Sequence, residues 1–274
     1  MHIGIIGYGS MGKMLLIKFI ESEHFKKDEL FVSSRSKEKL QEVEDKATVC
    51  DSNAEVAASS DIVFICLRPM DIKNVLEEIR ASLKPKTLLV SLNGSVSFTL
   101  LGNALSPEGE GRKIAKVIPS VTAEINRSQT LVCYNEYVEE KDKEALKELL
   151  CLIGNVIELP ENEIGMGSEL VSCMPGFIAS IFDCVCAAAK EHTSIPKEDV
   201  VRMVLQTMIA TGELMIQDDM TFEEVVTRVA TPGGITEEGT KVVYAQFPKT
   251  AQELFEKTLE KRKATFQKAE EAMK

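Results

Sequence analysis

The sequence is poor in the residues that mark metal sites, disulfide frameworks and nucleic-acid surfaces. It has no Trp and three His residues, and His2, His24 and His192 lie too far apart for a metal-binding pattern, so no metal site is expected. The seven Cys residues form no C-x-x-C pair and are odd in number, which is typical of reduced thiols in a cytoplasmic protein. Acidic residues (43) outnumber basic ones (32), and the net charge of −11 argues against nucleic acid or an anionic membrane as the main partner.

The most apolar stretch, residues 170–189, is interrupted by residues that a membrane span disfavours. It contains Pro175, Gly176 and Asp183, which make it a poor membrane span. We expect a helix there that is buried in the interior of the chain or in a subunit interface, and no membrane association.

The amino-terminal residues combine an apolar run with a glycine pattern. Ile3, Ile5 and Ile6 suit a buried parallel strand, which is followed by the spacing G-x-G-x-x-G and then by a helical pattern. A tight structural turn alone would also favour glycines, but the order of strand, turn and helix favours a pyrophosphate held at the helix N-terminus. We predict a dinucleotide bound by Gly7, Tyr8, Gly9, Ser10, Met11 and Gly12. The motif starts almost at the initiator Met, so no signal or transit peptide is expected before it.

With 274 residues the chain is long enough for two domains. Strand patterns at 3–6, 30–33, 48–50, 62–66, 87–91, 113–117, 130–134 and 156–159 alternate with helical patterns at 13–21, 37–46, 54–58, 69–81 and 141–152. After Pro160 only helical patterns follow, at 164–192, 197–216, 222–229, 236–247 and 249–274. This organisation predicts an α/β chain: a Rossmann-type doubly wound sheet over residues 1–160, followed by an all-α domain over residues 161–274.

The end of the second predicted strand indicates which dinucleotide is preferred. A site for NAD places a carboxylate there to accept the ribose hydroxyls, whereas this chain has Ser34, Arg35 and Ser36. The guanidinium of Arg35 can bind a 2′-phosphate, although a solvent-exposed basic turn is the alternative interpretation. We therefore predict NADP (as NADPH) as the cofactor, with NAD possible.

A second motif lies in the helical half of the chain. Pro232, Gly233 and Gly234 precede a helical pattern, so consecutive backbone N–H groups could face an anion at a helix N-terminus. Thr236 is placed to cap that helix. Taken alone, such a segment is more often a cap and a turn than a catalytic site.

Together these motifs resemble those of the pyrroline-5-carboxylate reductase family. The resemblance runs from end to end of the chain. It includes the glycine turn with Met11 and the segments Ser34-Arg35-Ser36, Ser60-Asp61-Ile62-Val63-Phe64, Leu67-Arg68-Pro69, Ile118-Pro119-Ser120, the Pro175 region and Pro232-Gly233-Gly234-Ile235-Thr236.

The resemblance implies an NADPH-dependent oxidoreductase that reduces the C=N bond of 1-pyrroline-5-carboxylate to L-proline, a reaction of amino-acid biosynthesis. It implies a homodimer that forms through the C-terminal helices, with the active site at the subunit interface, and it leaves open whether dimers stack into a larger ring. Thr236 would be the catalytic donor to the ring nitrogen. The other implied contacts are Thr231, Gly233, Gly234 and Ile235 for the substrate, Ser34 and Arg35 for the 2′-phosphate, Asn53 for the adenosine side, and Leu67, Arg68 and Pro69 for the cofactor cleft.

The chain departs from the family pattern at three places. It has Ile118-Pro119-Ser120-Val121-Thr122 for the usual Met-Pro-Asn-Thr-Pro, Ser172-Cys173-Met174-Pro175-Gly176 for Gly-Ser-Gly-Pro-Ala, and Arg68-Pro69 for Lys-Pro. Similar departures occur in a paralogue encoded with bacterial competence genes. They leave open a different cyclic imine as the substrate, or a regulatory dinucleotide-binding dimer without turnover.

Two other enzyme classes share the amino-terminal glycine turn. A β-hydroxyacid dehydrogenase would need a catalytic lysine on a central helix, and the nearest candidate, Lys190, lies at the far end of the apolar helix. A deazaflavin-dependent NADP reductase would not require the loop before Thr236.

Overall fold

The computed structural model describes residues 1–106 and 109–273 and divides into two compact units. The first, called the sheet unit here, joins Met1–Pro175 to the segment from Leu259 onward. The second, called the helical unit, is Gly176–Thr258. The domain boundary predicted between residues 160 and 161 stays a prediction.

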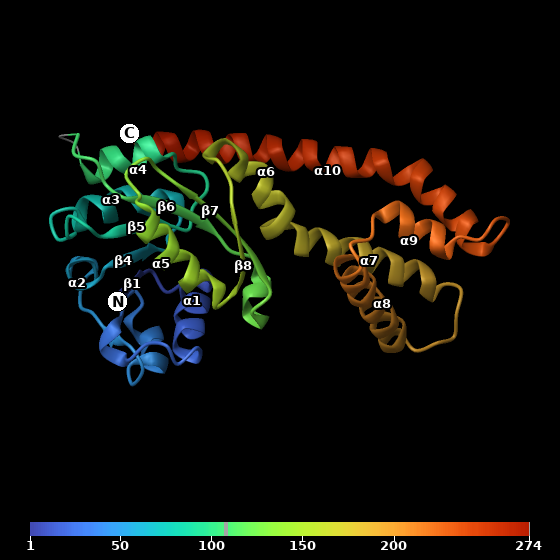
Figure 1. Cartoon of the computed structure of the whole chain (residues 1–274), viewed down its shortest axis with the longest axis horizontal. Helices are drawn as coiled ribbons and strands as arrows, with labels where there is room; N and C mark the ends of the chain where they lie inside the picture. The colour runs from blue at the N-terminus through green and yellow to red at the C-terminus, as the bar shows by residue number, and fades with distance from the viewer. Residues whose placement is uncertain (107–108, 274) are drawn as a thin grey trace. The chain divides into compact units, whose positions relative to one another are not determined.

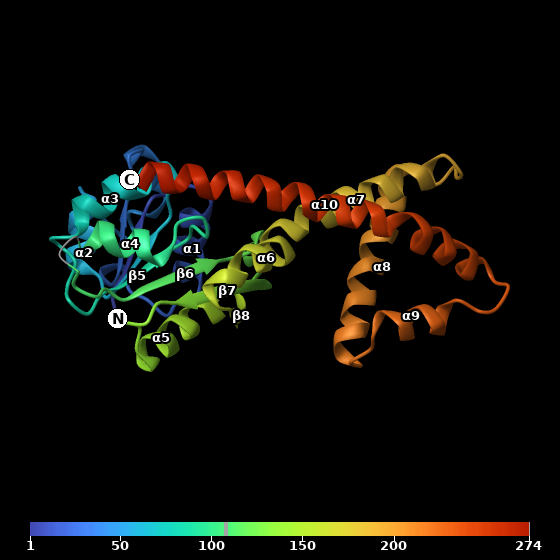
Figure 2. The same cartoon turned by 90° about the horizontal axis from the view of Figure 1, so that it is seen from above.

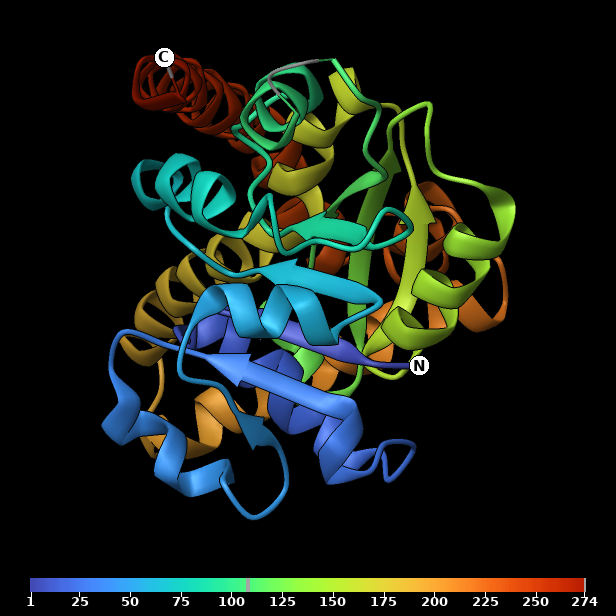
Figure 3. The ribbon, with the colours of Figure 1, turned by 90° about the vertical axis from the view of Figure 1, so that its left-hand side faces the viewer.

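The sheet unit is built on an eight-stranded sheet with the order β3-β2-β1-β4-β5-β6-β7-β8 (Figures 1 and 3). All neighbouring strands pair in parallel except β6 and β7, which are antiparallel. The first six strands follow the order 3-2-1-4-5-6 of doubly wound dinucleotide-binding sheets, which confirms the predicted fold class. The eight predicted strands are confirmed as β1 (Ile3–Ile6), β2 (Leu30–Ser33), β3 (Thr48–Val49), β4 (Ile62–Ile65), β5 (Leu88–Ser91), β6 (Ile114–Ile118), β7 (Ser128–Tyr134) and β8 (Gly154–Glu158).

Helices cover both faces of this sheet. One face is covered by α1 (Ser10–Glu21) and α5 (Glu140–Cys151), and the other by α2 (Asn53–Ser59), α3 (Pro69–Ile79) and α4 (Phe98–Leu105). Every residue of the central strands β1 and β4 is buried, as expected for parallel strands between two helical layers.

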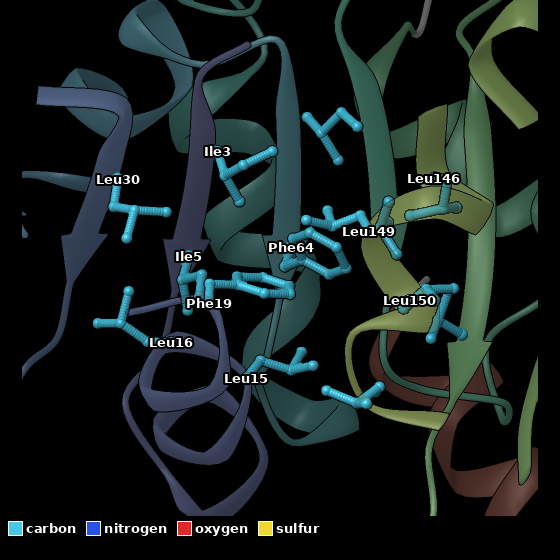
Figure 4. Packing of buried hydrophobic residues seen from close by; sticks show 14 of the residues in the cluster. Ile3, Ile5, Leu15, Leu16, Phe19, Leu30, Phe64, Leu146, Leu149 and Leu150 are labelled. Atoms are coloured by element: carbon cyan, nitrogen blue, oxygen red, sulfur yellow. The ribbon is translucent and has the colours of Figure 1, made fainter. Parts of the chain in front are cut away.

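The core between the sheet and α1 is dense and partly aromatic (Figure 4). The rings of Phe19 on α1 and Phe64 on β4 lie 5.8 Å apart between centroids, and both side chains are fully buried. Ile5 on β1 belongs to the same cluster. This packing fixes α1 against β1 and so positions the turn that joins them.

The helical unit is formed by α7 (Met174–Lys190), α8 (Lys197–Gln217), α9 (Phe222–Val229) and α10 (Ile235–Met273), the first and last of which also extend into the sheet unit (Figure 2). The predicted break between residues 247 and 249 is wrong, because α10 continues through Pro248. A proline removes one backbone donor from a helix, and the residues on both sides of Pro248 continue the helical pattern.

Three further differences concern local structure. The helix predicted at 37–46 is a 3₁₀ helix, η2 (Lys37–Val43), in which the buried Leu40 and Val43 share one side because this helix has three residues per turn. The helix α4 was not predicted, although Ser97 caps it by accepting the N–H of Leu100 at 3.3 Å. The helix predicted at 164–192 consists of α6 (Ile164–Ser168), a π-helical turn (η5, Glu169–Cys173) and α7. Besides η2, the described residues form the short 3₁₀ helices η1 (Lys27–Glu29), η3 (Val121–Ile125) and η4 (Glu161–Glu163).

The apolar helical run from Glu161 to Lys190 is long and apolar enough to cross a membrane by length and composition alone. Little of it is buried within the single chain, and Cys186 is the one buried residue of α7. Burial of this helix in the interior of the chain is therefore not what the structure shows, and its location in a subunit interface stays a prediction.

Candidate functional site

The candidate dinucleotide site lies between β1 and β4, where the order of the strands in the sheet reverses. The chain leaves β1 through α1 toward β2 on one side, and leaves β4 through α3 toward β5 on the other. The carboxyl ends of β1 and β4 therefore form the switch point at which doubly wound sheets bind ligands. Gly7 follows β1 there, and Cys66 follows β4.

The three glycines of the turn have different roles. Gly7 has φ = +100°, and a Cβ on it would lie 2.6 Å from the carbonyl oxygen of Cys66. A Cβ on Gly12 would lie 2.0 Å from the carbonyl oxygen of Gly7. A Cβ on Gly9 would meet no described atom within 4 Å. The fold itself therefore requires Gly7 and Gly12, whereas Gly9 leaves open space beside the backbone for a ligand.

The N-terminus of α1 offers donors beside that open space. Gly9 is the N-cap residue, and it makes no side-chain capping hydrogen bond. The N–H of Lys13 donates to the carbonyl oxygen of Gly9 at 2.8 Å and closes the first helical turn. The preceding amides, from Ser10 to Gly12, have no partner within the helix and can donate to a pyrophosphate.

A pocket of about 490 Å³ opens at the switch point. It brings together eight predicted cofactor residues: Gly7, Tyr8, Gly9, Ser34, Arg35, Asn53, Leu67 and Arg68. Ser10 lines a second pocket that shares Tyr8, Gly9 and Lys39 with the first. Met11, Gly12 and Pro69 do not line the first pocket; Gly12 packs on the turn, and Pro69 is the first residue of α3.

One side of the pocket is basic and is bridged by a carboxylate. The Oδ2 atom of Asp71 lies 3.2 Å from Nε of Arg68 and 3.5 Å from Nη2 of Arg35. Ser34 lies beside Arg35, and its hydroxyl accepts the N–H of Ser36 at 3.2 Å.

Asn53 is held in place from two sides. Its Oδ1 accepts the hydroxyl of Ser33 at 2.7 Å, and its Nδ2 donates to Oε2 of Glu78 at 2.8 Å. Three further residues of α3, Asp71, Asn74 and Glu78, line the same pocket and were not predicted from the sequence. Asp71 and Asn74 are three positions apart, and Asn74 and Glu78 are four positions apart, in a helix that the sequence predicts from Pro69 onward. This spacing is the signal that could have placed them on one side of that helix.

The rim of the pocket near Gly9 is formed by a hydrogen-bonded triad. The hydroxyl of Tyr8, a residue only 5% exposed, donates to Oε1 of Glu42 at 3.0 Å, and Nζ of Lys13 donates to Oε2 at 2.8 Å. Burial, together with the bond to Glu42, raises the pKa of Tyr8, and the bond from Lys13 lowers the pKa of Glu42. The triad therefore keeps a neutral phenol beside the glycine turn.

These features fit a dinucleotide. Gly9 leaves a cradle without a side chain, the start of α1 supplies backbone donors, and Arg35 and Arg68 line the same pocket with positive charge.

The loop before α10 is organised differently from the sequence expectation. Gly233 has φ = +71°, its N–H donates to Oε2 of Glu237 at 2.6 Å, and the N–H of Gly234 donates to the carbonyl oxygen of Thr231 at 2.9 Å. The hydrogen bond to Thr231 closes the turn at Gly234, so α10 begins at Ile235. Thr236 is consequently the second residue of the helix, and the expected N-cap is wrong.

The single chain therefore gives both glycine amides an internal partner. Glu237 occupies the position at which the N–H of Gly233 could donate to an external carboxylate, and the pKa of Glu237 is lowered by that N–H and by the Lys241 ammonium. Ile235 is 95% exposed and Thr236 is half-buried.

A mostly parallel sheet with a glycine turn at its switch point, followed by a helical unit, defines a Rossmann-type dinucleotide-binding protein. Two family models match the chain: "NADP oxidoreductase coenzyme F420-dependent" over residues 2–94, and "Pyrroline-5-carboxylate reductase dimerisation" over residues 161–265. The chain is 35% identical over 263 residues to pyrroline-5-carboxylate reductase 3 of Bacillus subtilis, which covers 95% of both proteins. The chain belongs to the pyrroline-5-carboxylate reductase family.

The chain is also similar to two further proteins. ComE operon protein 4 of Bacillus subtilis is 27% identical over 246 residues, which cover 89% of this chain and 88% of that protein. A crystal structure of pyrroline carboxylate reductase from Plasmodium falciparum with NADP bound superposes with a TM-score of 0.82 at 22% identity, and the match covers 100% of this chain and 98% of that one. This likeness shows the fold.

Proposed function

We propose that the protein is an NADPH-dependent pyrroline-5-carboxylate reductase that forms L-proline. The 35% identity to reductase 3 over 95% of both chains carries this proposal. When bound, NADPH supplies a hydride from nicotinamide C4 to the carbon of the C=N bond, and the ring nitrogen takes a proton. The products are NADP⁺ and the cyclic amine.

The protein's own residues would bind and orient the two reactants. The amides that follow Gly9 would hold the pyrophosphate, and Ser34 with Arg35 would hold the 2′-phosphate, since these groups line one pocket or its neighbour. The Thr236 hydroxyl would donate to the ring nitrogen and fix its orientation.

The substrate carboxylate would bind at the loop that contains Thr231, Gly233, Gly234 and Ile235. The amide of Gly233 supports this assignment, because it already binds a carboxylate, that of Glu237. Substrate binding would therefore require Glu237 to release this amide.

We also propose that the protein is a cytoplasmic homodimer joined through its helical unit. The dimerisation family model covers residues 161–265. In residues 176–258, all of which the structure describes, only Cys186 and Val200 are buried apolar residues. The seven cysteines are free thiols, which suits a reducing compartment. Assembly of dimers into a larger ring stays a prediction.

The test is NADPH oxidation by the purified protein with 1-pyrroline-5-carboxylate. We expect turnover by the wild type and a loss of about 30- to 1000-fold in kcat/KM for Thr236→Ala, because a positioned donor contributes roughly 2–4 kcal/mol. Thr240→Ala is the matched control: Thr240 lies one turn after Thr236, and its hydroxyl donates to the carbonyl oxygen of Glu237 at 2.9 Å. A wild-type protein that binds NADPH without reducing the imine would contradict the proposed function.

A second candidate function is a paralogue that acts on another cyclic imine or has a regulatory role. The 27% identity to ComE operon protein 4 favours it. Ser120, which replaces the usual asparagine, is 2% exposed; its N–H donates to Ser128, and its hydroxyl accepts from Thr122. Its polar groups are thus used inside the fold. A comparison of five-membered with six-membered cyclic imino acids tests this candidate, and tight NADPH binding without turnover would favour the regulatory role.

The β-hydroxyacid dehydrogenase interpretation lacks a catalytic lysine. The ammonium of Lys190 donates to the carbonyl oxygens of Thr193 at 3.2 Å and Ile195 at 2.8 Å. It therefore stabilises the turn that follows α7.

A further inference from the structure

A further pocket, called the α10 pocket here, lies against the carboxyl-terminal half of α10 within the sheet unit and has a volume of about 540 Å³. Of the described residues, none lines both this pocket and the dinucleotide pocket, and none from the 231–236 loop lines it. Pockets of about 300–1,000 Å³ are typical of sites for small molecules. The α10 pocket therefore has the size of a ligand site, apart from the two places that the proposed reaction uses.

One side of α10 supplies much of the lining. Four lining residues are spaced by three, four and seven positions along this helix and so lie on one side of it: Leu259, Arg262, Lys263 and Phe266. Further along the same side, Ala269 and Met273 are buried in the core, whereas Leu259 and Phe266 are only half-buried. The helix therefore presents two incompletely covered apolar side chains to the pocket, and the two cations stand between them in the sequence.

The carboxylate that lines the α10 pocket is already paired. Oε1 of Glu161 forms an ion pair with the ammonium of Lys116, a β6 residue that is 1% exposed, and it accepts the N–H of Phe98 at 2.9 Å. The Lys116 ammonium also lies 4.8 Å from the centre of the Phe98 ring. Lys116 and Glu161 therefore neutralise each other and add no net charge to the pocket.

The two cations of α10 differ in how far they are paired. Arg262 donates through Nε and Nη2 to Oε1 of Glu169 at 2.9 and 2.7 Å, and its Nη1 makes no hydrogen bond with the described residues. Lys263 is exposed and has no ion-pair partner within residues 1–106 and 109–273. The pocket therefore has an uncompensated positive charge beside apolar surface, which is complementary to an anion with an apolar part.

We propose that the α10 pocket binds a small organic carboxylate with an apolar body. The carboxylate accepts hydrogen bonds from Nη1 of Arg262 and from the ammonium of Lys263, and the apolar body covers Leu259 and Phe266. The inference goes beyond the proposed reaction and does not depend on it.

The experiment is a calorimetric titration of the intact chain with hexanoate and with benzoate, in saturating NADPH so that the dinucleotide pocket is occupied. Hexanol and benzyl alcohol have the same apolar bodies without the charge. Each carboxylate should bind about three- to tenfold more tightly than its alcohol, because hydrogen bonds to a charged group are stronger than neutral ones. Failure of both carboxylates to bind, or equally tight binding of the alcohols, overturns the inference.

Variants of two exposed lysines on α10 locate the bound carboxylate. Lys263→Glu should weaken carboxylate binding by about tenfold or more, because it reverses the charge beside the ligand. Lys268→Glu makes the same change at an exposed lysine that does not line the pocket, and it should leave the affinity unchanged. Equal affinities in the two variants overturn the inference, whether or not the protein reduces any imine.

Leu259→Trp tests the apolar half of the site. The larger side chain should fill the pocket and abolish carboxylate binding, and chemical denaturation shows whether the variant unfolds like the wild type. A variant that unfolds like the wild type and binds both carboxylates with unchanged affinity overturns the inference. Since Lys263 is exposed, its variant keeps the test independent of folding.

Discussion

The sheet unit and the helical unit complete their cores in different ways. In the sheet unit the central strands are buried on both sides by helices of the same chain. The end of α10 contributes Ala269 and Met273 to this core. In the helical unit many large apolar side chains are exposed. They include Met203, Leu205, Ile209, Val242, Val243 and Tyr244, which are 43–63% exposed. Exposed apolar surface of this kind is typical of protein interfaces. The sheet unit therefore completes its core within one chain, whereas the helical unit leaves apolar surface that the proposed homodimer would cover.

The largest expected effect comes from a charge placed on the exposed apolar side of α10. Val243→Asp should convert the dimer into a monomer in sedimentation analysis and lower imine reduction by about a hundredfold or more, because an unpaired charge buried in an interface costs about 3–5 kcal/mol. NADPH binding should persist, since the pocket lies within the sheet unit.

Val49→Asp is the control for that variant. Val49 is also an exposed valine, 38% exposed on β3 of the sheet unit, and its replacement should leave the dimer intact. A dimeric and active Val243→Asp protein would show that this side of α10 is not an interface.

A pair of glycine variants would sharpen the comparison within the sheet unit. Gly12→Ala should lower the free energy of unfolding by about 1–3 kcal/mol and weaken NADPH binding, because its Cβ would lie 2.0 Å from the backbone oxygen of Gly7. Gly9→Ala should unfold like the wild type and still lose NADPH binding, because its Cβ fills only the open cradle. Chemical denaturation and dinucleotide titration measure the two effects. Equal loss of stability in both variants would contradict the distinction drawn between these glycines.

A buried ion pair joins the end of α10 to the π-helical turn of the sheet unit. Nε and Nη2 of Arg262 donate to Oε1 of Glu169 at 2.9 and 2.7 Å, and Glu169 is 2% exposed. Oε2 of Glu169 is buried and has no hydrogen-bond partner among the described residues. Arg262→Met would leave a buried, unpaired carboxylate, so the free energy of unfolding should fall by about 3–5 kcal/mol.

The double variant Glu169→Met with Arg262→Met is the control. It removes both charges and should recover most of the lost stability in the same denaturation experiment. A single variant as stable as the wild type would mean that Arg262 does not compensate the Glu169 charge.

The sequence predicts what depends on neighbouring residues. The eight strands and the glycine turn follow from short apolar runs and from the spacing of Gly7, Gly9 and Gly12. The bond from Gly233 to Glu237 is equally local, and a capping analysis could have found it.

Features that depend on distant packing were not predictable in the same way. The side chain of Asp71 enters the pocket because of the orientation of α3 against the sheet, and Glu169 meets Arg262 across 93 positions. The exposed side of α10 shows the same limit, since a sequence pattern cannot distinguish apolar residues exposed on a helix from apolar residues buried inside the chain.

The smallest expected effect concerns the loop of residues 231–235 in the helical unit, which we propose binds the substrate carboxylate. Glu237 binds the Gly233 amide, and this bond, with the Lys241 ammonium, lowers the pKa of Glu237 below its ordinary value of 4.5. A lowered pKa means that the contact is complete above pH 4.5 and is lost as the pH falls through the lowered value. Near neutral pH the charged carboxylate would therefore compete for this amide with the carboxylate of a substrate bound as proposed. Glu237→Gln should lower the KM for 1-pyrroline-5-carboxylate by roughly two- to fivefold, since an exposed charged contact contributes little.

Glu238→Gln, which changes the adjacent carboxylate, is the control and should leave the KM unchanged. A higher KM in Glu237→Gln would instead show that Glu237 supports the loop in its binding conformation.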